Sequence, residues 1–206
     1  MTKDLRTKLG RKKKLSSSTL RTLARAEDLK ISGRHEKAIE ILQSLLTREP
    51  ECLEAVEEIS DNFLSLDEFE KARNSAEFAL SLDSKSSIAN HILGFLILQN
   101  DDFKTAVKFL QKANESDANN PEILRCLGWA LFHTGKRSEG IAVLQRSISL
   151  DSQNVMGFCD LGVCFLQQEN FAVAKRLFQK ALEIDPDCDR AAECLDLVEK
   201  VERGDL

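Results

Sequence analysis

The sequence predicts an all-α protein, a solenoid in which five helix pairs stack on one another and a last helix closes the stack. Gly94, Gly128 and Gly162 each follow a leucine and lie 34 residues apart. Small residues recur with the same period twelve positions further on, at Ala38, Ala72, Ala106, Gly140 and Ala174. The apolar residues beside them have helical spacing. Because one helix pair cannot bury its apolar face alone, this period predicts a stack of pairs.

The fifth unit shows the helical spacing most clearly. Its first helix carries apolar or small residues three or one positions apart, namely Phe158, Leu161, Gly162 and Phe165. Its second helix carries Ala174, Phe178 and Ala181. Both spacings are typical of helices and differ from the alternation of a strand. Glu169 and Asn170 are expected to separate the two helices, and Asp185-Pro186 to end the second.

These residues resemble the tetratricopeptide repeat (TPR) family. In the fifth unit the residues at family signature positions are Phe158, Leu161, Gly162, Phe165, Ala174, Phe178, Ala181 and Pro186. Counting in steps of 34 gives five repeats without insertion, at 19–52, 53–86, 87–120, 121–154 and 155–188. The resemblance implies a right-handed superhelix whose first helices line a concave groove. It also implies binding of peptides or partner helices, without catalysis.

Residues 189–203 are expected to form a capping helix. Asp189 is a candidate N-cap residue, and Gly204 is expected to end the helix. The apolar stripe comprises Ala191, Cys194, Leu195, Val198 and Val201. A helix with one apolar and one polar face suits the open end of a stack.

Residues 1–18 are strongly basic, with seven lysines and arginines against one acid, Asp4. The whole chain has a net charge of −5, so the remainder carries −11 once the +6 of this tail is removed. We expect a disordered, solvated tail. The alternatives are contact with nucleic acid, an anionic membrane or an acidic protein face, or a nuclear address in Arg11–Lys14.

The resemblance to the family also implies which residues face the groove. The candidate partner-binding residues are Glu27, Glu54, Glu57, Asp61, His91, Phe95, Leu98, Arg125, Trp129, Phe132, His133, Met156, Val163 and Leu166. The N-terminal half of this set is acidic and the C-terminal half is mostly apolar. Family members that hold the C-terminal carboxylate of heat-shock chaperones use lysine and asparagine in their first helices. Here Glu27, Glu57 and Asp61 stand at those places and would repel a carboxylate.

Trp129 is the only tryptophan, and two interpretations of it stay open. A neighbouring second helix could cover it and make it part of the core. Alternatively, Trp129 and Phe95, its counterpart one repeat earlier, are aromatic anchors for a partner.

The sequence carries no motif of a known catalytic site. It has no glycine-rich phosphate loop, no Gly-x-Ser-x-Gly and no His-Glu-x-x-His. Its six cysteines include no Cys-x-x-Cys pair, so we expect free thiols and no metal. We therefore predict a protein that is not an enzyme, with no cofactor and no small-molecule substrate. The N-terminus lacks the apolar stretch of a secretory signal, so we expect a cytoplasmic location.

Two kinds of function remain, and both depend on protein contacts. The first is an adaptor or chaperone that binds an apolar, partly basic segment in the groove. The second is a scaffold in which the basic tail of one copy lies in the acidic groove half of the next, giving a homo-oligomer. A second, shorter resemblance favours the first kind: Phe158–Cys164 and Arg190–Leu195 are similar to segments of class II chaperones of type III secretion.

Overall fold

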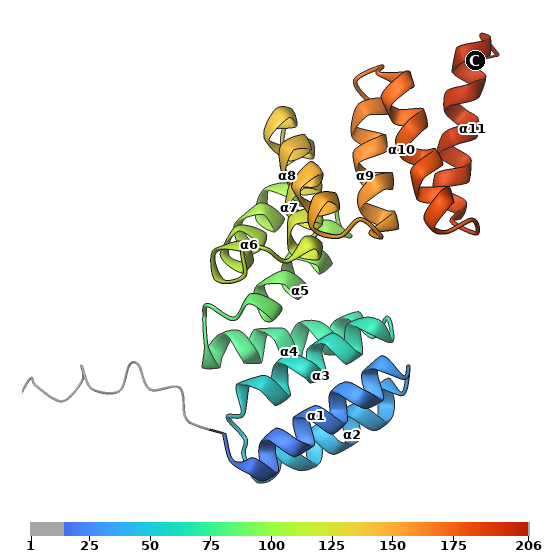
Figure 1. Ribbon diagram of the computed structural model, residues 1–206. Helices are drawn as coiled ribbons and strands as arrows, with labels where there is room; N and C mark the ends of the chain where they lie inside the picture. The colour runs from blue at the N-terminus through green and yellow to red at the C-terminus, as the bar shows by residue number, and fades with distance from the viewer. Residues whose placement is uncertain (1–14, 206) are drawn as a thin grey trace, which may run out of the picture.

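The computed structural model describes residues 15–205, which form eleven α-helices and no strand. Ten of the helices make five antiparallel pairs, and α11 follows the last pair (Figure 1). The helices are α1 (Ser17–Ile31), α2 (His35–Leu46), α3 (Leu53–Ser65), α4 (Phe69–Leu82), α5 (Ser87–Leu98), α6 (Phe103–Ser116), α7 (Pro121–His133), α8 (Arg137–Leu150), α9 (Val155–Leu166), α10 (Phe171–Ile184) and α11 (Asp189–Arg203). The predicted all-α solenoid is confirmed. No helix in residues 15–205 is long and apolar enough to span a bilayer.

The small residues of the 34-residue period lie where the two helices of a pair approach each other most closely. In the second pair the Ser60 hydroxyl on α3 donates a hydrogen bond to the Ala72 carbonyl on α4, at 2.8 Å. In the fourth pair both positions are glycine. A Cβ atom at Gly128 would lie 2.9 Å from the Gly140 carbonyl oxygen, and one at Gly140 would lie 2.6 Å from the Gly128 carbonyl oxygen. No side chain fits between α7 and α8 at this point.

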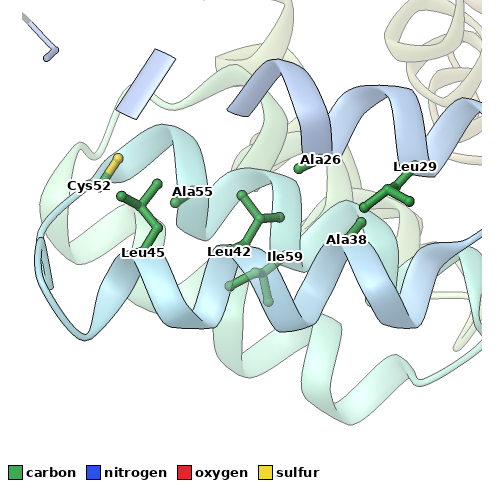
Figure 2. Close-up of a cluster of buried hydrophobic side chains, with 8 residues drawn as sticks. All are labelled: Ala26, Leu29, Ala38, Leu42, Leu45, Cys52, Ala55 and Ile59. Atoms are coloured by element: carbon green, nitrogen blue, oxygen red, sulfur yellow. The ribbon is translucent and has the colours of Figure 1, made fainter. Parts of the chain in front are cut away.

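The core continues from pair to pair. Figure 2 shows its first cluster, in which Ala26 and Leu29 of α1, Leu42 of α2 and Ile59 of α3 converge. Ile59 belongs to the next repeat yet packs against the first pair. The apolar area that one pair leaves open is thus covered by its neighbour, as the period predicts.

The turns inside the pairs share one backbone feature that the sequence analysis missed. One residue in each turn has a positive φ, and these residues recur every 34 positions: Gly33, Asp67, Asp101, Gly135 and Glu169. Two are glycines, which adopt this conformation at little cost, and two are aspartates, which tolerate it. Asn170 follows as the N-cap of α10, accepting a hydrogen bond from the Val173 amide. The expected break at Glu169 and Asn170 is confirmed.

The ends of the stack differ slightly from expectation. The helix α1 begins at Ser17, inside the predicted tail, because the Ser16 hydroxyl accepts a hydrogen bond from the Thr19 amide at 3.1 Å. Residues 1–14 of that tail lie outside the described residues. The expected N-cap at Asp189 is wrong: Cys188 holds that position, and Asp189 is the first residue of α11. Gly204 ends α11 with a φ of 76°, as predicted.

Candidate partner-binding groove

The first helices of the pairs form the inner wall of the stack. Each contacts the next one along the chain, from α1 to α3 and onward to α11. Within residues 15–205, the backbones of successive second helices such as α2 and α4 do not approach each other in this way. A stack whose elements lie close together on one side and apart on the other curves toward the closer side. The concave face is therefore made by α1, α3, α5, α7 and α9.

The N-terminal half of this face contains a shallow depression of about 320 Å³. Its lining consists of Leu23, Ala24, Glu27, Glu54, Glu57, Glu58 and Ile88, and we call it the acidic depression. Leu23, Ala24 and Ile88 supply its apolar surface, while the four glutamates come from α1 and α3. Of the candidate groove residues, Glu27, Glu54 and Glu57 meet here. Glu58 was missed by the sequence analysis.

One lysine offsets part of the negative charge at this site. The Lys30 ammonium lies 2.9 Å from Glu58 and 3.2 Å from Asp61. Burial disfavours the charged amine, but these two carboxylates outweigh burial and raise the pKa of Lys30. Burial raises the pKa of Glu57, and the negative charges of Glu54, Asp83 and Glu58 raise it further. The hydrogen bond that the Ser86 hydroxyl donates to Glu57 lowers this pKa, but the net shift is upward. The glutamates thus repel one another, and a cation placed among them would be stabilised.

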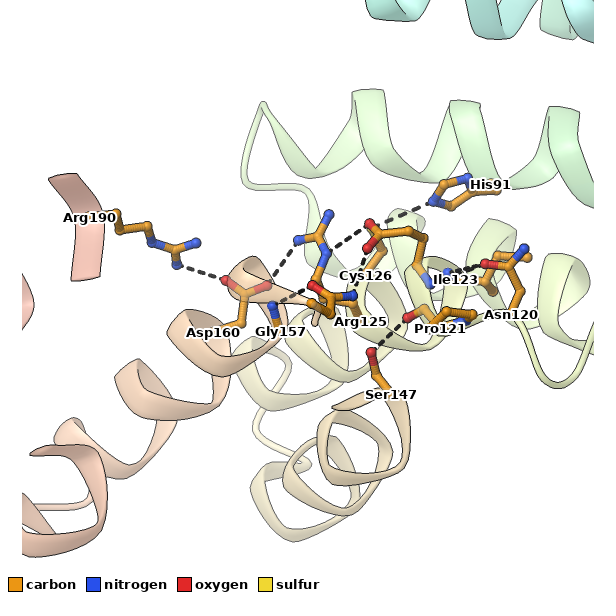
Figure 3. Close-up of polar contacts among 12 residues, drawn as sticks. His91, Asn120, Pro121, Ile123, Arg125, Cys126, Ser147, Gly157, Asp160 and Arg190 are labelled. Carbon is orange, nitrogen blue, oxygen red and sulfur yellow. Dashed lines mark hydrogen bonds and ion pairs between the residues drawn. The ribbon is translucent and has the colours of Figure 1, made fainter. Parts of the chain in front are cut away.

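The C-terminal half of the face is held by a chain of ion pairs that joins α7, α9 and α11 (Figure 3). The Arg125 guanidinium on α7 donates to Glu122 at 3.0 Å and to Asp160 on α9 at 2.9 Å. The other oxygen of Asp160 lies 2.8 Å from Arg190 on α11, and its side chain is only 3% exposed. Asn154, the N-cap of α9, donates to Glu122 at 2.7 Å. Arg125, a candidate contact residue, is therefore already engaged within the protein.

Asp160 and Arg190 are the residues of this chain of ion pairs that the sequence analysis missed. A signal for Asp160 was present, because it is the only charged residue in the otherwise apolar run of α9, Val155–Leu166. A lone carboxylate in such a run must find a partner when the helix is buried. Its partners lie about one repeat away on either side, on α7 and on α11.

Trp129 is half-buried and belongs to an aromatic stack. The Arg190 guanidinium lies over its ring at 5.5 Å, and the His133 ring centre is 4.2 Å away. His133 in turn stacks on Phe103 of α6, with ring centres 4.6 Å apart. The core interpretation thus holds in part: Trp129 packs against the buried cluster around Leu161, and Arg190 of α11 and His133 of its own helix also lie against its ring. Burial lowers the pKa of His133, which keeps its imidazole neutral near pH 7.

Phe132 is not available to a partner, which corrects the sequence-based expectation. It is 2% exposed and packs against Leu144, Leu161 and Cys164. The reason is the close approach of α8: a Cβ atom at Gly140 would lie 2.6 Å from the Phe132 amide nitrogen. The other apolar candidates Phe95, Leu98, Val163 and Leu166 are half-buried, while Met156 is exposed. The groove is therefore less apolar than its sequence indicates.

The remaining polar candidate, His91, also faces its neighbours. Its Nε2 lies 3.7 Å from the Cys126 thiol on α7, and burial lowers the pKa of His91. Burial also raises the pKa of Cys126 to about 11, and that of Cys164 to about 12, so both thiols stay protonated near neutral pH. In residues 15–205 no three of His, Cys, Asp and Glu are grouped to hold a metal ion.

Replacing Trp129 with alanine is expected to lower the free energy of unfolding by about 1–3 kcal/mol, since its ring is half-buried and its cation–π contact adds to the loss. Urea unfolding followed by circular dichroism measures the change. A double-mutant cycle with Arg190→Ala should show a coupling of about 0.5–2 kcal/mol. Met156→Ala, at an exposed position on the same face, serves as the control. Equal effects of Trp129→Ala and Met156→Ala would contradict the packing described here.

The comparison with known proteins agrees with this architecture. Residues 156–188, which span the pair α9–α10, match the tetratricopeptide repeat family model. The chain superposes on a chain of the APC/C hetero-tetramer Cut9–Hcn1 with a TM-score of 0.78 and 16% identity, over 86% of this chain and 35% of that one. This chain has the tetratricopeptide-repeat fold. It also matches YrrB, a TPR protein with an unusual peptide-binding site, with a TM-score of 0.60 and 22% identity over 84% of this chain and 89% of that one.

A curated relative that this chain matches is longer than the chain itself. The BBSome complex member BBS4 homolog of Drosophila melanogaster is 29% identical over 171 residues, 82% of this chain. The tetratricopeptide-repeat stack spans only 34% of that relative, and 30% or less of the other curated relatives it matches. Proteins with this fold are generally interaction modules.

Proposed function

We propose that the concave face binds a partner segment that presents lysines or arginines beside an apolar stripe, and that the protein acts as an adaptor or chaperone without catalysis. The acidic depression carries this proposal. It combines four glutamates with an apolar surface from Leu23, Ala24 and Ile88. A basic amphipathic segment matches both features, because its cations would relieve the repulsion among the glutamates while its apolar side covers Ile88.

The same charges argue against a partner held by its C-terminal carboxylate at this place. Glu27, Glu57 and Asp61 stand where the resemblance to the family implies that such a group would bind, and Lys30 is already paired with two carboxylates. YrrB, which shares this fold, has a peptide-binding site, and this supports a peptide as the ligand. Further along the groove, the exposed Met156 offers an additional apolar contact.

Fluorescence anisotropy with synthetic probe peptides tests the proposal. One labelled helical peptide carries lysines on one side and leucines on the other, and a second has glutamate in place of each lysine. The protein should bind the basic peptide and not the acidic one. Binding should weaken as salt rises, because the Debye length falls from about 8 Å at 0.15 M to about 3 Å at 1 M ionic strength.

Replacing Glu54 and Glu57 together with glutamine should weaken binding of the basic peptide about 2- to 30-fold, the range expected for two partly exposed ion pairs. Glutamine keeps the shape of the side chain, and its carbonyl oxygen can still accept the hydrogen bond of Ser86. The matched control is Glu70→Gln with Glu77→Gln, both exposed on α4, away from the concave face. Equal weakening by both pairs of substitutions would show that net charge, and not the acidic depression, attracts the peptide.

A further inference from the structure

The chain itself carries a segment with the chemistry that the acidic depression favours. Residues 1–14 hold seven basic residues and one acidic residue, with four basic residues in a row at Arg11–Lys14. They also hold Leu5 and Leu9 as apolar side chains. We propose that this segment docks in the acidic depression of its own molecule. The inference rests on the proposed function, since it names one occupant of the same site.

The position of the segment allows this contact. Residue 14 lies three positions before Ser17, the start of α1, and α1 lines the depression through Leu23, Ala24 and Glu27. The six residue steps along the helix from Ser17 to Leu23 correspond to about 9 Å of rise. The three to six residue steps that separate Arg11–Lys14 from Ser17 can extend at most about 10–22 Å. The basic run at Arg11–Lys14 is therefore within reach of Glu54 and Glu57, which lie near the start of the adjacent helix α3.

On the opposite side of the first helix pair, docking of residues 1–14 is disfavoured. A second depression, of about 340 Å³, is lined by Ser18, Arg21, Thr22, Arg25, Ile41, Ser44 and Arg48. We call it the arginine depression. Among residues 15–205, no carboxylate forms an ion pair with any of its three arginines. The helix α1 thus has a basic side and an acidic side, and a basic segment leaving its N-terminus is repelled by one and attracted by the other.

Occupation within one molecule is favoured over occupation by a second copy. A short connection holds the segment near the site at an effective concentration in the millimolar range, far above the concentration of protein in a dilute sample. Docking in this way would make the segment a competitor of an external basic partner. The partner would then have to displace it in order to bind.

Zero-length carbodiimide cross-linking of the full chain tests the proposal, because it joins a lysine amine to a carboxylate only when the two are in contact. An equal mixture of unlabelled and ¹⁵N-labelled protein is cross-linked and analysed by mass spectrometry. We expect links from Lys12, Lys13 or Lys14 to Glu54, Glu57 or Glu58 that never combine a light with a heavy peptide. These links should be lost at 1 M salt and in the Glu54→Gln, Glu57→Gln protein.

Three results would overturn the proposal. Links that combine light and heavy peptides would assign the site to a second copy. Links to Glu70 and Glu77 on α4 in equal yield would show that the segment has no preferred place. Absence of links to the acidic depression at low salt would leave that site to other partners.

A second variant separates this proposal from the proposed function. Replacing Lys12, Lys13 and Lys14 with glutamine removes the charges of the competitor, so affinity for the basic probe peptide should rise severalfold. Unchanged affinity would overturn docking of the segment while the peptide-binding function stands. If the cross-links form but no variant binds the peptide, docking of the segment stands and the proposed function fails.

Discussion

Replacing Gly128 with leucine is expected to unfold the fourth helix pair. A Cβ atom at this position would lie 2.9 Å from the Gly140 carbonyl oxygen and 2.9 Å from the Leu144 amide nitrogen, and both are backbone atoms of α8. Backbone cannot move aside as a side chain can, so even alanine forces the helices apart. Overpacking of this kind typically costs about 1–3 kcal/mol, and leucine should exceed that range.

The effect should reach beyond one pair. In a stack each pair contacts only its neighbours, so loss of the fourth pair uncouples the first three from α9, α10 and α11. Urea unfolding followed by circular dichroism should show a lower midpoint and a broadened or two-step transition. Gly162→Leu should cost less, because there the obstacle is the ring of Phe178, a side chain that can shift.

The control for this prediction is Ala142→Leu, at an exposed position on α8 of the same pair. It adds the same kind of side chain without entering the contact between the helices, and should change stability by less than about 0.5 kcal/mol. A Gly128→Leu protein that unfolds at the same urea concentration as the parent would refute the close approach of α7 and α8.

Replacing Asp160 with alanine is expected to have the second large effect, a loss of about 3–5 kcal/mol in the free energy of unfolding. Its carboxylate lies between Arg125 at 2.9 Å and Arg190 at 2.8 Å, and the Arg125 side chain is only 15% exposed. Without the carboxylate, two like charges face each other and Arg125 stays largely out of water. The loss therefore reflects the repulsion between Arg125 and Arg190, and a largely buried Arg125 that keeps its pair with Glu122 alone among the described residues, more than the strength of the original pairs.

Hydrogen exchange locates the damage predicted for Asp160→Ala. Because Arg190 ties α11 to α9 through this residue, amides of α11 should exchange faster, while those of α1 and α2 should not change. Asp196→Ala is the control, since Asp196 forms an exposed pair with Lys200 within α11 and should matter by less than about 0.5 kcal/mol. Equal stability of the Asp160→Ala and Asp196→Ala proteins would show that the buried ion pairs do not hold the C-terminal end.

Peptide binding adds an independent check on the two halves of the groove. Asp160→Ala acts on α7, α9 and α11, whereas the acidic depression is built by α1, α3 and α5. A stack transmits packing changes mainly to neighbouring repeats, so the basic probe peptide should bind the Asp160→Ala protein as well as the parent, provided the N-terminal pairs remain folded.

Local signals in the sequence determined the helices. The positions of the helix pairs follow from a period of 34 residues and from helical spacing within each unit, and both are properties of neighbouring residues. The same holds for the break at Asn170 and the end at Gly204, which depend on caps and backbone conformation. The repeat also indicates which positions recur on the inner wall, but not how apolar the groove is, because Phe132 at one of these positions is buried.

The tertiary structure decided which of these inner residues are free. Phe132 occupies the same repeat position as the half-buried Leu98 and Leu166, yet it is buried because Gly140 lets α8 approach more closely than an alanine would. Arg125 and Trp129 face the groove by position, but Asp160 and Arg190 from other repeats engage them. A period identifies equivalent places along the backbone. Which long side chains meet across repeats depends on their rotamers and on the distance between helices, and only the packed stack sets both.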